Sequence, residues 1–141
     1  MTSNKTLLTL LVSVCTFLLL TSTTCYEVED LYIYNGLDQP IWVGNAYYSD
    51  AYPLPPEGTE PQYQSDYFRK YPAKEFSIFG GFQLDEKKEV KKYTIVVTVI
   101  RDDVYRSTPF NEIIAGRMYD TDTISGSELM KSDFLVTYPF K

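Results

Sequence analysis

The sequence predicts an all-β protein: a small antiparallel β-sandwich of about seven strands, or a small barrel, preceded by a signal peptide. Short runs of alternating apolar and polar residues recur along the chain, separated by Gly, Pro, Asn and Ser turn signals. No long amphipathic helix, heptad pattern or internal repeat interrupts them. An uncharged apolar run lies near the N-terminus, ahead of every strand-like segment.

The N-terminal segment has the three parts of a signal peptide. Lys5 is its only charged residue, the run from Leu7 to Leu20 is apolar, and small polar residues follow up to Cys25. Because a membrane-spanning helix needs about 20 apolar residues, an uncleaved anchor or a buried core helix is disfavoured. A lipoprotein reading of Cys25 is disfavoured too, because the residues before it do not form a lipidation box. We therefore expect a signal peptide over residues 1–25 and a secreted, extracellular protein.

The position of the cut decides the thiol chemistry of the secreted domain. The two cysteines, Cys15 and Cys25, lie in the leader or at its edge. No intramolecular disulfide is therefore expected, and stability has to come from packing. A cut between Ser22 and Tyr26 either removes Cys25 or leaves it as a single thiol able to link two chains.

Residues 26–141 suffice for one domain with a core of its own and are too few for two. The whole chain carries a net charge of −6, and all 13 tyrosines lie in this domain. An acidic balance disfavours nucleic acid as a partner, because phosphate neutralisation needs surplus Lys and Arg.

The first strand-like segment begins at Val28 and places Leu31 and Ile33 on one face. Asn35-Gly36 marks a turn, and Pro40 opens a second run over residues 41–48. The short spacing between the two runs favours a hairpin.

The segment from residue 49 to residue 72 is rich in proline and tyrosine and has no period of either kind. We interpret it as a long ordered loop or an irregular crossing segment, a feature that is often functional in compact domains. The alternative is that its tyrosines cap an open end of the core.

Phe76 to Leu84 alternates again around a break or bulge at Gly80-Gly81, and a charged turn follows over residues 85–89. The run from Lys92 to Ile100 is the strongest strand signal in the chain. Its apolar residues occupy both faces, which predicts a buried, central strand.

Later signals are weaker. The segment Pro109 to Ala115 fits a short helix or a strand, and residues 118–124 are typical of a polar edge strand. A turn is expected over residues 125–127, and Phe134 to Tyr138 forms the last alternating strand.

Catalysis is disfavoured because the chain contains no histidine. This removes the commonest general base and the commonest zinc ligand. A small carboxylate-dependent hydrolase is the enzymatic alternative, since two acids across a cleft can hydrolyse a glycoside. Its candidate acids have no distinctive motif around them; they are Glu75, Asp102, Asp103, Asp120 and Asp122.

Asp120 and Asp122 are weak candidates for a calcium site, because alternate residues of a strand share a face. The sequence favours a solvated edge strand whose acids discourage aggregation. The lysine-rich turn near residues 87–92 also contains acids and is interpreted as solvated. No cofactor is expected.

The sequence gives its clearest binding signal in the aromatic residues of strand 41–48 and of segment 49–72. Tyrosine and proline together form a stiff, amphipathic surface that loses little entropy on binding. We expect a non-enzymatic protein that presents these residues to an extracellular protein or glycan, and a membrane-acting protein of toxin-like or lipid-binding kind is the alternative. The candidate binding residues are Trp42, Tyr47, Tyr48, Tyr52, Tyr63, Tyr67 and Tyr71.

Overall fold

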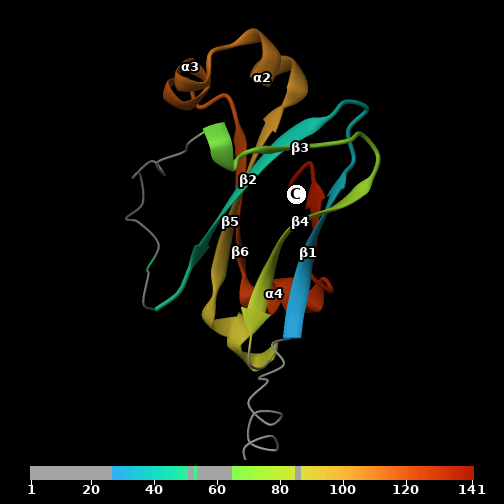
Figure 1. Cartoon of the computed structure of the whole chain (residues 1–141), viewed down its shortest axis with the longest axis vertical. Coiled ribbons are helices and arrows are strands. Elements are labelled where there is room, and N and C mark those ends of the chain that lie inside the picture. The colour runs from blue at the N-terminus through green and yellow to red at the C-terminus, as the bar shows by residue number, and fades with distance from the viewer. Residues whose placement is uncertain (1–26, 51–52, 54–64, 85–86) are drawn as a thin grey trace, which may run out of the picture.

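The computed structural model of the chain describes residues 27–50, 53, 65–84 and 87–141. Its strands form two sheets that face each other and do not close into a barrel, in keeping with a small β-sandwich (Figure 1). The predicted signal peptide, residues 1–25, lies outside the described residues.

The first sheet, sheet A, has the strand order β4-β1-β7. It consists of β1 (Glu27–Asn35), β4 (Phe76–Leu84) and β7 (Leu135–Tyr138). β1 pairs antiparallel with β4 but parallel with β7. The prediction of a purely antiparallel sandwich is therefore wrong at β7, although the strand itself is confirmed.

The second sheet, sheet B, is antiparallel throughout and has the order β3-β2-β5-β6. It consists of β2 (Ile41–Tyr48), β3 (Arg69–Tyr71), β5 (Thr94–Arg101) and β6 (Asp120–Ser125). The central position predicted for the run ending at Ile100 is confirmed, and so is the edge position of the polar strand near residue 120.

The expected hairpin between the first two strands is wrong, because β1 lies in sheet A and β2 in sheet B. Buried Asn35 shapes this crossing. Its side-chain amide donates to the carbonyls of Gln39 and Pro72, each at 2.9 Å, and its side-chain oxygen accepts from the N–H of Leu37. These hydrogen bonds turn the chain out of one sheet and into the other.

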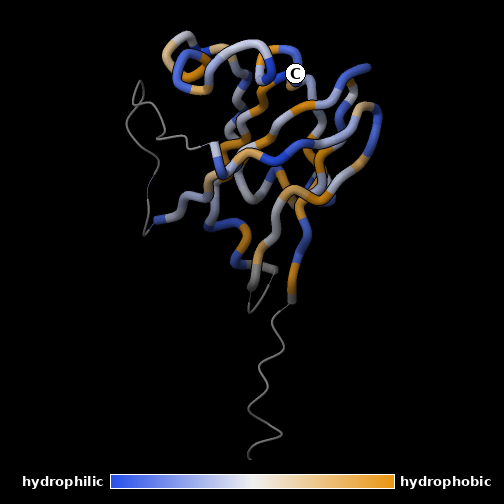
Figure 2. Tube along the Cα trace, turned by 45° about the horizontal axis from the view of Figure 1, so that its top comes forward, coloured by the Kyte–Doolittle hydropathy of each residue, from blue (hydrophilic) through white to orange (hydrophobic). Residues whose placement is uncertain are grey.

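The main core lies between the sheets, as the alternating patterns predict. Leu31 and Ile33 of β1 face Val43 of β2 and Val97 of β5 across it, all fully or almost fully buried. Figure 2 shows hydrophobic positions recurring along the strands of both sheets, with hydrophilic stretches between them. Stability comes from this burial, at about 25 cal/mol per Å² of apolar surface.

Short helices fill the connections. They are η1 (Ser65–Tyr67), η2 (Lys87–Lys92), α2 (Asp102–Ser107), α3 (Phe110–Ala115) and α4 (Gly126–Lys131). Segment 109–115 is thus a helix, whereas the expected turn at residues 125–127 is wrong because α4 begins there. η1 and β3 also replace irregular chain at the end of segment 49–72. None of the described helices is long and apolar enough to cross a membrane.

A second apolar cluster covers the outer face of sheet B. Phe68, Ile100 and Ile113 are buried there, and α2 and α3 contribute most of the residues around them. Gly44 makes the cluster possible, because a Cβ at that position would lie 3.0 Å from the ring of Phe68. The predicted burial of β5 on both faces is confirmed in this part of the sheet.

The break predicted at Gly80-Gly81 is a bulge one residue earlier. The register of β4 against β1 shifts between Ile78 and Gly80, which leaves Phe79 as the extra residue. Phe79 is buried, whereas Phe76 and Ile78 are exposed on the outer face of sheet A. The bulge therefore changes which residues of β4 face the core.

Candidate functional site

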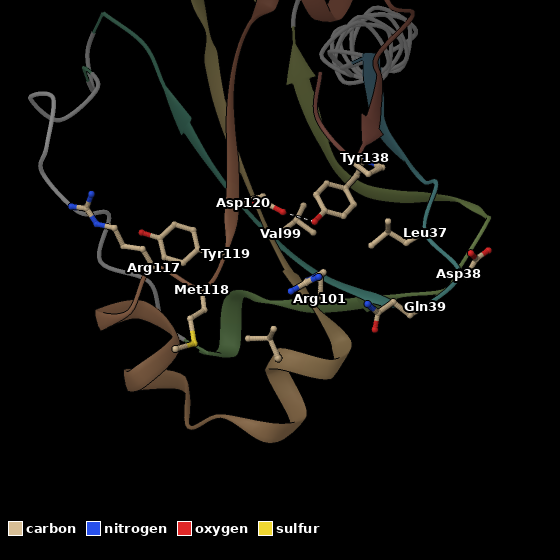
Figure 3. Close-up of a pocket in the computed structure, with 12 residues that line it drawn as sticks. Leu37, Asp38, Gln39, Val99, Arg101, Arg117, Met118, Tyr119, Asp120 and Tyr138 are labelled. Carbon is tan, nitrogen blue, oxygen red and sulfur yellow. Dashed lines mark hydrogen bonds between the residues drawn. The ribbon is translucent and has the colours of Figure 1, made fainter.

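A cleft of about 990 Å³ opens at the end of the sandwich that carries α2 and α3 (Figure 3). Its walls come from segments far apart in the sequence, including the β1–β2 crossing, the end of β5, α2, the start of β6 and the end of β7. The lining residues are Leu37, Asp38, Gln39, Val99, Arg101, Val104, Arg117, Met118, Tyr119, Asp120, Tyr138 and Pro139.

Arg101 occupies the middle of the cleft because of the alternation of β5. Val97 and Val99 point into the core, so two residues later Arg101 points the same way, beyond the end of the packed interior. Figure 3 shows it with Asp120 and Tyr138 on one side and Gln39 on another. Its side chain is 53% exposed, and its closest described carboxylate, on Asp103, lies 3.9 Å from its Nε.

Asp120 and Tyr138 form the polar floor of the cleft. Asp120 pairs with Val99 across the β5–β6 ladder and therefore shares its inward face. The Tyr138 hydroxyl donates to the Asp120 carboxylate at 2.5 Å. Burial raises the pKa of Tyr138 above its usual range, and the bond to Asp120 raises it further. The hydroxyl thus stays protonated at neutral pH.

The opposite wall is the β1–β2 crossing, which is fixed against β7. The Gly36 N–H donates to the Tyr138 carbonyl at 2.7 Å, and a Cβ on Gly36 would lie 2.9 Å from that oxygen. Lys74 donates to the Gly36 carbonyl and pairs with Asp38 at 3.3 Å. These contacts fix the segment that carries Gln39, which lines the cleft together with Arg101 (Figure 3).

A separate polar cluster surrounds Asp102, the first residue of α2. Its buried carboxylate accepts from Trp42 Nε1 at 2.9 Å and pairs with Lys70 at 3.0 Å and Arg106 at 2.8 Å. Burial alone would raise the pKa of Asp102, but these hydrogen bonds and the Arg106 charge outweigh burial and lower it. The cluster anchors α2 to sheet B.

The predicted aromatic residues that the structure describes do not gather on one surface. Trp42 stacks on Tyr105 of α2, with ring centroids 3.9 Å apart, and helps to hold the Asp102 cluster. Tyr71 packs against the main core. Tyr47 bridges the sheets, because its hydroxyl accepts from the Gly81 N–H at 3.3 Å and its ring contacts Phe82.

Two further aromatic candidates reach solvent to different degrees. Tyr48 is half-buried at the end of β2, and Tyr67 in η1 is largely exposed. Tyr52 and Tyr63 lie outside the described residues.

The two aspartates of β6 line different hollows. Asp120 lies in the cleft, whereas Asp122 lines a smaller hollow of about 280 Å³ beside α4. The Asp122 carboxylate accepts from the N–H of Thr123. Among the described residues, no group of three or more His, Cys, Asp or Glu side chains could hold a metal ion.

Sequence reasoning singled out Asp120 but missed the rest of the cleft. Arg101 was detectable as the first charged residue on the inward face of the strongest strand. No local sequence pattern marks Tyr138 or Gln39 as a cleft residue. They line the same cleft only because β7 meets the β1–β2 crossing in the folded chain. No match to this chain is found among protein-family models, curated proteins or solved structures.

Proposed function

We propose that this chain is a secreted, non-enzymatic binding protein that holds a glycan in the cleft at the α2–α3 end. The observation that carries the proposal is Arg101, a half-exposed cation in the middle of a concave, mixed polar and apolar site. Pockets of this size with a few converging polar groups are typical of ligand sites.

The composition of the cleft suits a sugar. A sugar ring presents hydroxyl groups at its edge and C–H groups on its faces, so it needs both planar polar and apolar partners. The Arg101 guanidinium and the Gln39 amide supply donors, and the Asp38 carboxylate supplies an acceptor. Leu37 and Met118 supply apolar contact.

Binding is favoured over catalysis because the two ionisable groups on the cleft floor, Asp120 and Tyr138, are hydrogen-bonded to each other. The Asp120 carboxylate already accepts a hydrogen bond from the Tyr138 hydroxyl, and the raised pKa of Tyr138 keeps that phenol from acting as a base at neutral pH. Asp102, another candidate acid for hydrolysis, is held by three donors at the start of α2. Neither carboxylate is arranged as a free general base.

The proposal places the ligand in the cleft instead of on the aromatic residues of segment 49–72. Trp42 and Tyr71 support packing, and Tyr47 is occupied at Gly81. Tyr67 remains available as an exposed contact for a larger partner.

The first experiment screens the purified protein against a glycan array and measures the best ligand by calorimetry. Arg101→Gln keeps the size of the side chain and removes its charge, and we expect it to weaken binding about tenfold or more, as the loss of a charged hydrogen bond does. Lys131→Gln is the matched control, because it makes the same charge change on α4, at the other end of the sandwich (Figure 1). Equal affinity in both variants would reject the cleft as the site.

Secretion is tested separately by expressing the full chain in secreting cells and measuring the intact mass of the product. We expect the mass of a chain that begins at Tyr26. The same monomer mass should be found with and without reductant. A retained leader would contradict the signal-peptide assignment.

A further inference from the structure

Within the part of the chain that the structure describes, β4 is an edge strand without the usual protection against pairing. Its sequence, FSIFGGFQL, contains no charged residue and no proline over residues 76–84. Natural edge strands are commonly blocked by charge, by proline or by a covering segment, because their unpaired backbone groups can accept another strand. The other edge of sheet A, β7, is much shorter and is followed directly by Pro139.

The ladder with β1 fixes which backbone groups of β4 face outward. The Asn35 N–H donates to the Glu75 carbonyl at 3.1 Å, so these two residues form a hydrogen-bonded pair. Hydrogen-bonded and non-hydrogen-bonded pairs alternate in an antiparallel ladder, and the register places Ser77 opposite Ile33 in the next bonded pair. The N–H and C=O groups of Phe76 and Ile78 therefore point away from β1.

Only a short stretch of β4 presents unpaired backbone groups away from β1, and this stretch ends at the bulge. No described residue hydrogen-bonds to the outward groups of Phe76 or Ile78. Beyond the bulge, the Gly81 N–H is covered by the Tyr47 hydroxyl, which also packs against Gly80. The stretch open to a new strand is thus centred on Ser77.

The side chains of this stretch are apolar and exposed. Phe76 is 65% exposed and Ile78 is 54% exposed, both on the outer face of sheet A, where the ring of Phe76 lies 4.7 Å from that of Tyr34. α2, α3 and Phe68 cover the corresponding face of sheet B. The described residues provide no such cover for Phe76 and Ile78.

We propose that β4 pairs antiparallel with β4 of a second copy of this chain, about a two-fold axis at Ser77. In this register, Phe76 of each copy lies opposite Ile78 of the other. Both positions carry outward N–H and C=O groups, so the two pairs close four backbone hydrogen bonds. Each exposed phenylalanine also gains the other copy's isoleucine as its cross-strand neighbour, and the two sheets A become one continuous sheet.

A second copy fits this edge because the segment is uncharged and its outward hydrogen-bonding groups are self-complementary in the antiparallel register. The chain carries a net charge of −6, so most approaches of two copies bring like charges together. The uncharged β4 edge avoids this repulsion. The pairing is short compared with the roughly 800 Å² per partner of a standard interface, so the dimer depends on protein concentration.

Sedimentation equilibrium of the purified protein over a concentration series tests the proposal, with reductant present so that a dimer linked through Cys25 does not contribute. We expect a monomer–dimer equilibrium that weakens at least tenfold in Ile78→Lys, which places a charge on the paired edge. Val28→Lys is the control, because Val28 is 58% exposed on the outer face of the same sheet but lies on β1, away from the β4 edge. It should dimerise like the unchanged protein.

Two results would overturn the proposal. One is an unchanged protein that stays monomeric throughout the series. The other is equal weakening in both variants, which would indicate packing through the sheet face instead of pairing at the edge. Phe76→Glu provides a second edge variant should Ile78→Lys lose its native circular dichroism spectrum.

Discussion

At Asp102, the effect of burial on the carboxylate opposes the effects of charge and hydrogen bonding. Its partners Trp42, Lys70 and Arg106 come from β2, β3 and α2, so a single carboxylate joins three elements. A buried carboxylate without partners would be costly, whereas one held by charged donors contributes to stability. The sequence cannot reveal this role, because two of the donors lie far from residue 102 along the chain.

The lowered pKa of Asp102 makes stability depend on pH. A group whose pKa is lower in the folded protein stabilises it above the unfolded value of about 3.9, and the contribution disappears as the pH falls through the folded pKa. We expect Asp102→Asn to lower the free energy of unfolding by about 2 kcal/mol at pH 7. The difference from the unchanged protein should shrink at pH 3, measured by urea unfolding at both values.

Neighbouring acids provide the controls for this measurement. Asp103→Asn changes an exposed residue whose closest described cation is 3.9 Å away, so it should shift stability by less than about 0.5 kcal/mol. The pKa of Glu128 is also lowered, by hydrogen bonds from Ser125, but Glu128 is present in every variant and cancels in the comparison. A deficit in Asp102→Asn that stays the same at pH 3 would argue against the charged form as the stabilising one.

At the scale of elements, α4 shows how a six-residue helix is held in place. The Ser125 side chain caps it by accepting from the Glu128 N–H, and the Glu128 carboxylate accepts from the Ser125 N–H at 2.8 Å, which completes a capping box. Gly126 then packs directly on η2: its N–H donates to the Tyr93 carbonyl, and a Cβ there would lie 1.8 Å from the Val90 carbonyl oxygen. Backbone meets backbone at this position, so no side chain can be accommodated without moving η2.

Gly126→Ala therefore should be among the most damaging single-methyl changes in the chain. We expect a loss of about 3 kcal/mol in the free energy of unfolding, because the added methyl group displaces main chain instead of a flexible side chain. Ser127→Ala, one residue later on the exposed face of the same helix, should change stability by less than about 0.5 kcal/mol. Thermal or urea unfolding of the two variants tests this prediction. Similar stabilities would contradict the close contact between Gly126 and the Val90 carbonyl.

The elements that could be predicted from the sequence are those whose pattern repeats within the element itself. β5 carries enough β-branched residues to be recognised alone, and β1 shows the period of two over Leu31 and Ile33. α2 and α4 span fewer than two turns, too short for a period of 3.6 to appear. The Ser125–Glu128 capping box was still a visible signal for α4.

Connections and sites were less predictable, because they depend on partners elsewhere in the chain. The spacing between β1 and β2 fits a hairpin, but the Asn35 amide binds Pro72, and that long-range contact sends the chain across to sheet B. The cleft also depends on contacts between distant parts of the chain, because only the pairing of β5 with β6 brings Arg101 and Asp120 together. The alternation of β5 and β6 puts both side chains on inward faces, but no pattern within either strand indicates that these faces meet.

At the scale of the whole molecule, helices cover the outer face of sheet B, whereas no described residue covers the β4 edge of sheet A or exposed Phe76 and Ile78 on its outer face. This predicts an alternating pattern of amide hydrogen exchange along β4, measured residue by residue by NMR in dilute solution. The Ser77 N–H points into the ladder with Ile33 and should exchange slowly, whereas those of Phe76 and Ile78 should exchange fast. At high protein concentration the two fast amides should become protected, because strand pairing would supply their missing acceptors. The Val97 amide, in the centre of sheet B, should exchange slowly at both concentrations.

Protection of the Phe76 and Ile78 amides in the dilute monomer would mean that this edge is not free. Slow exchange throughout β4 would contradict the outward orientation from which the pairing was inferred.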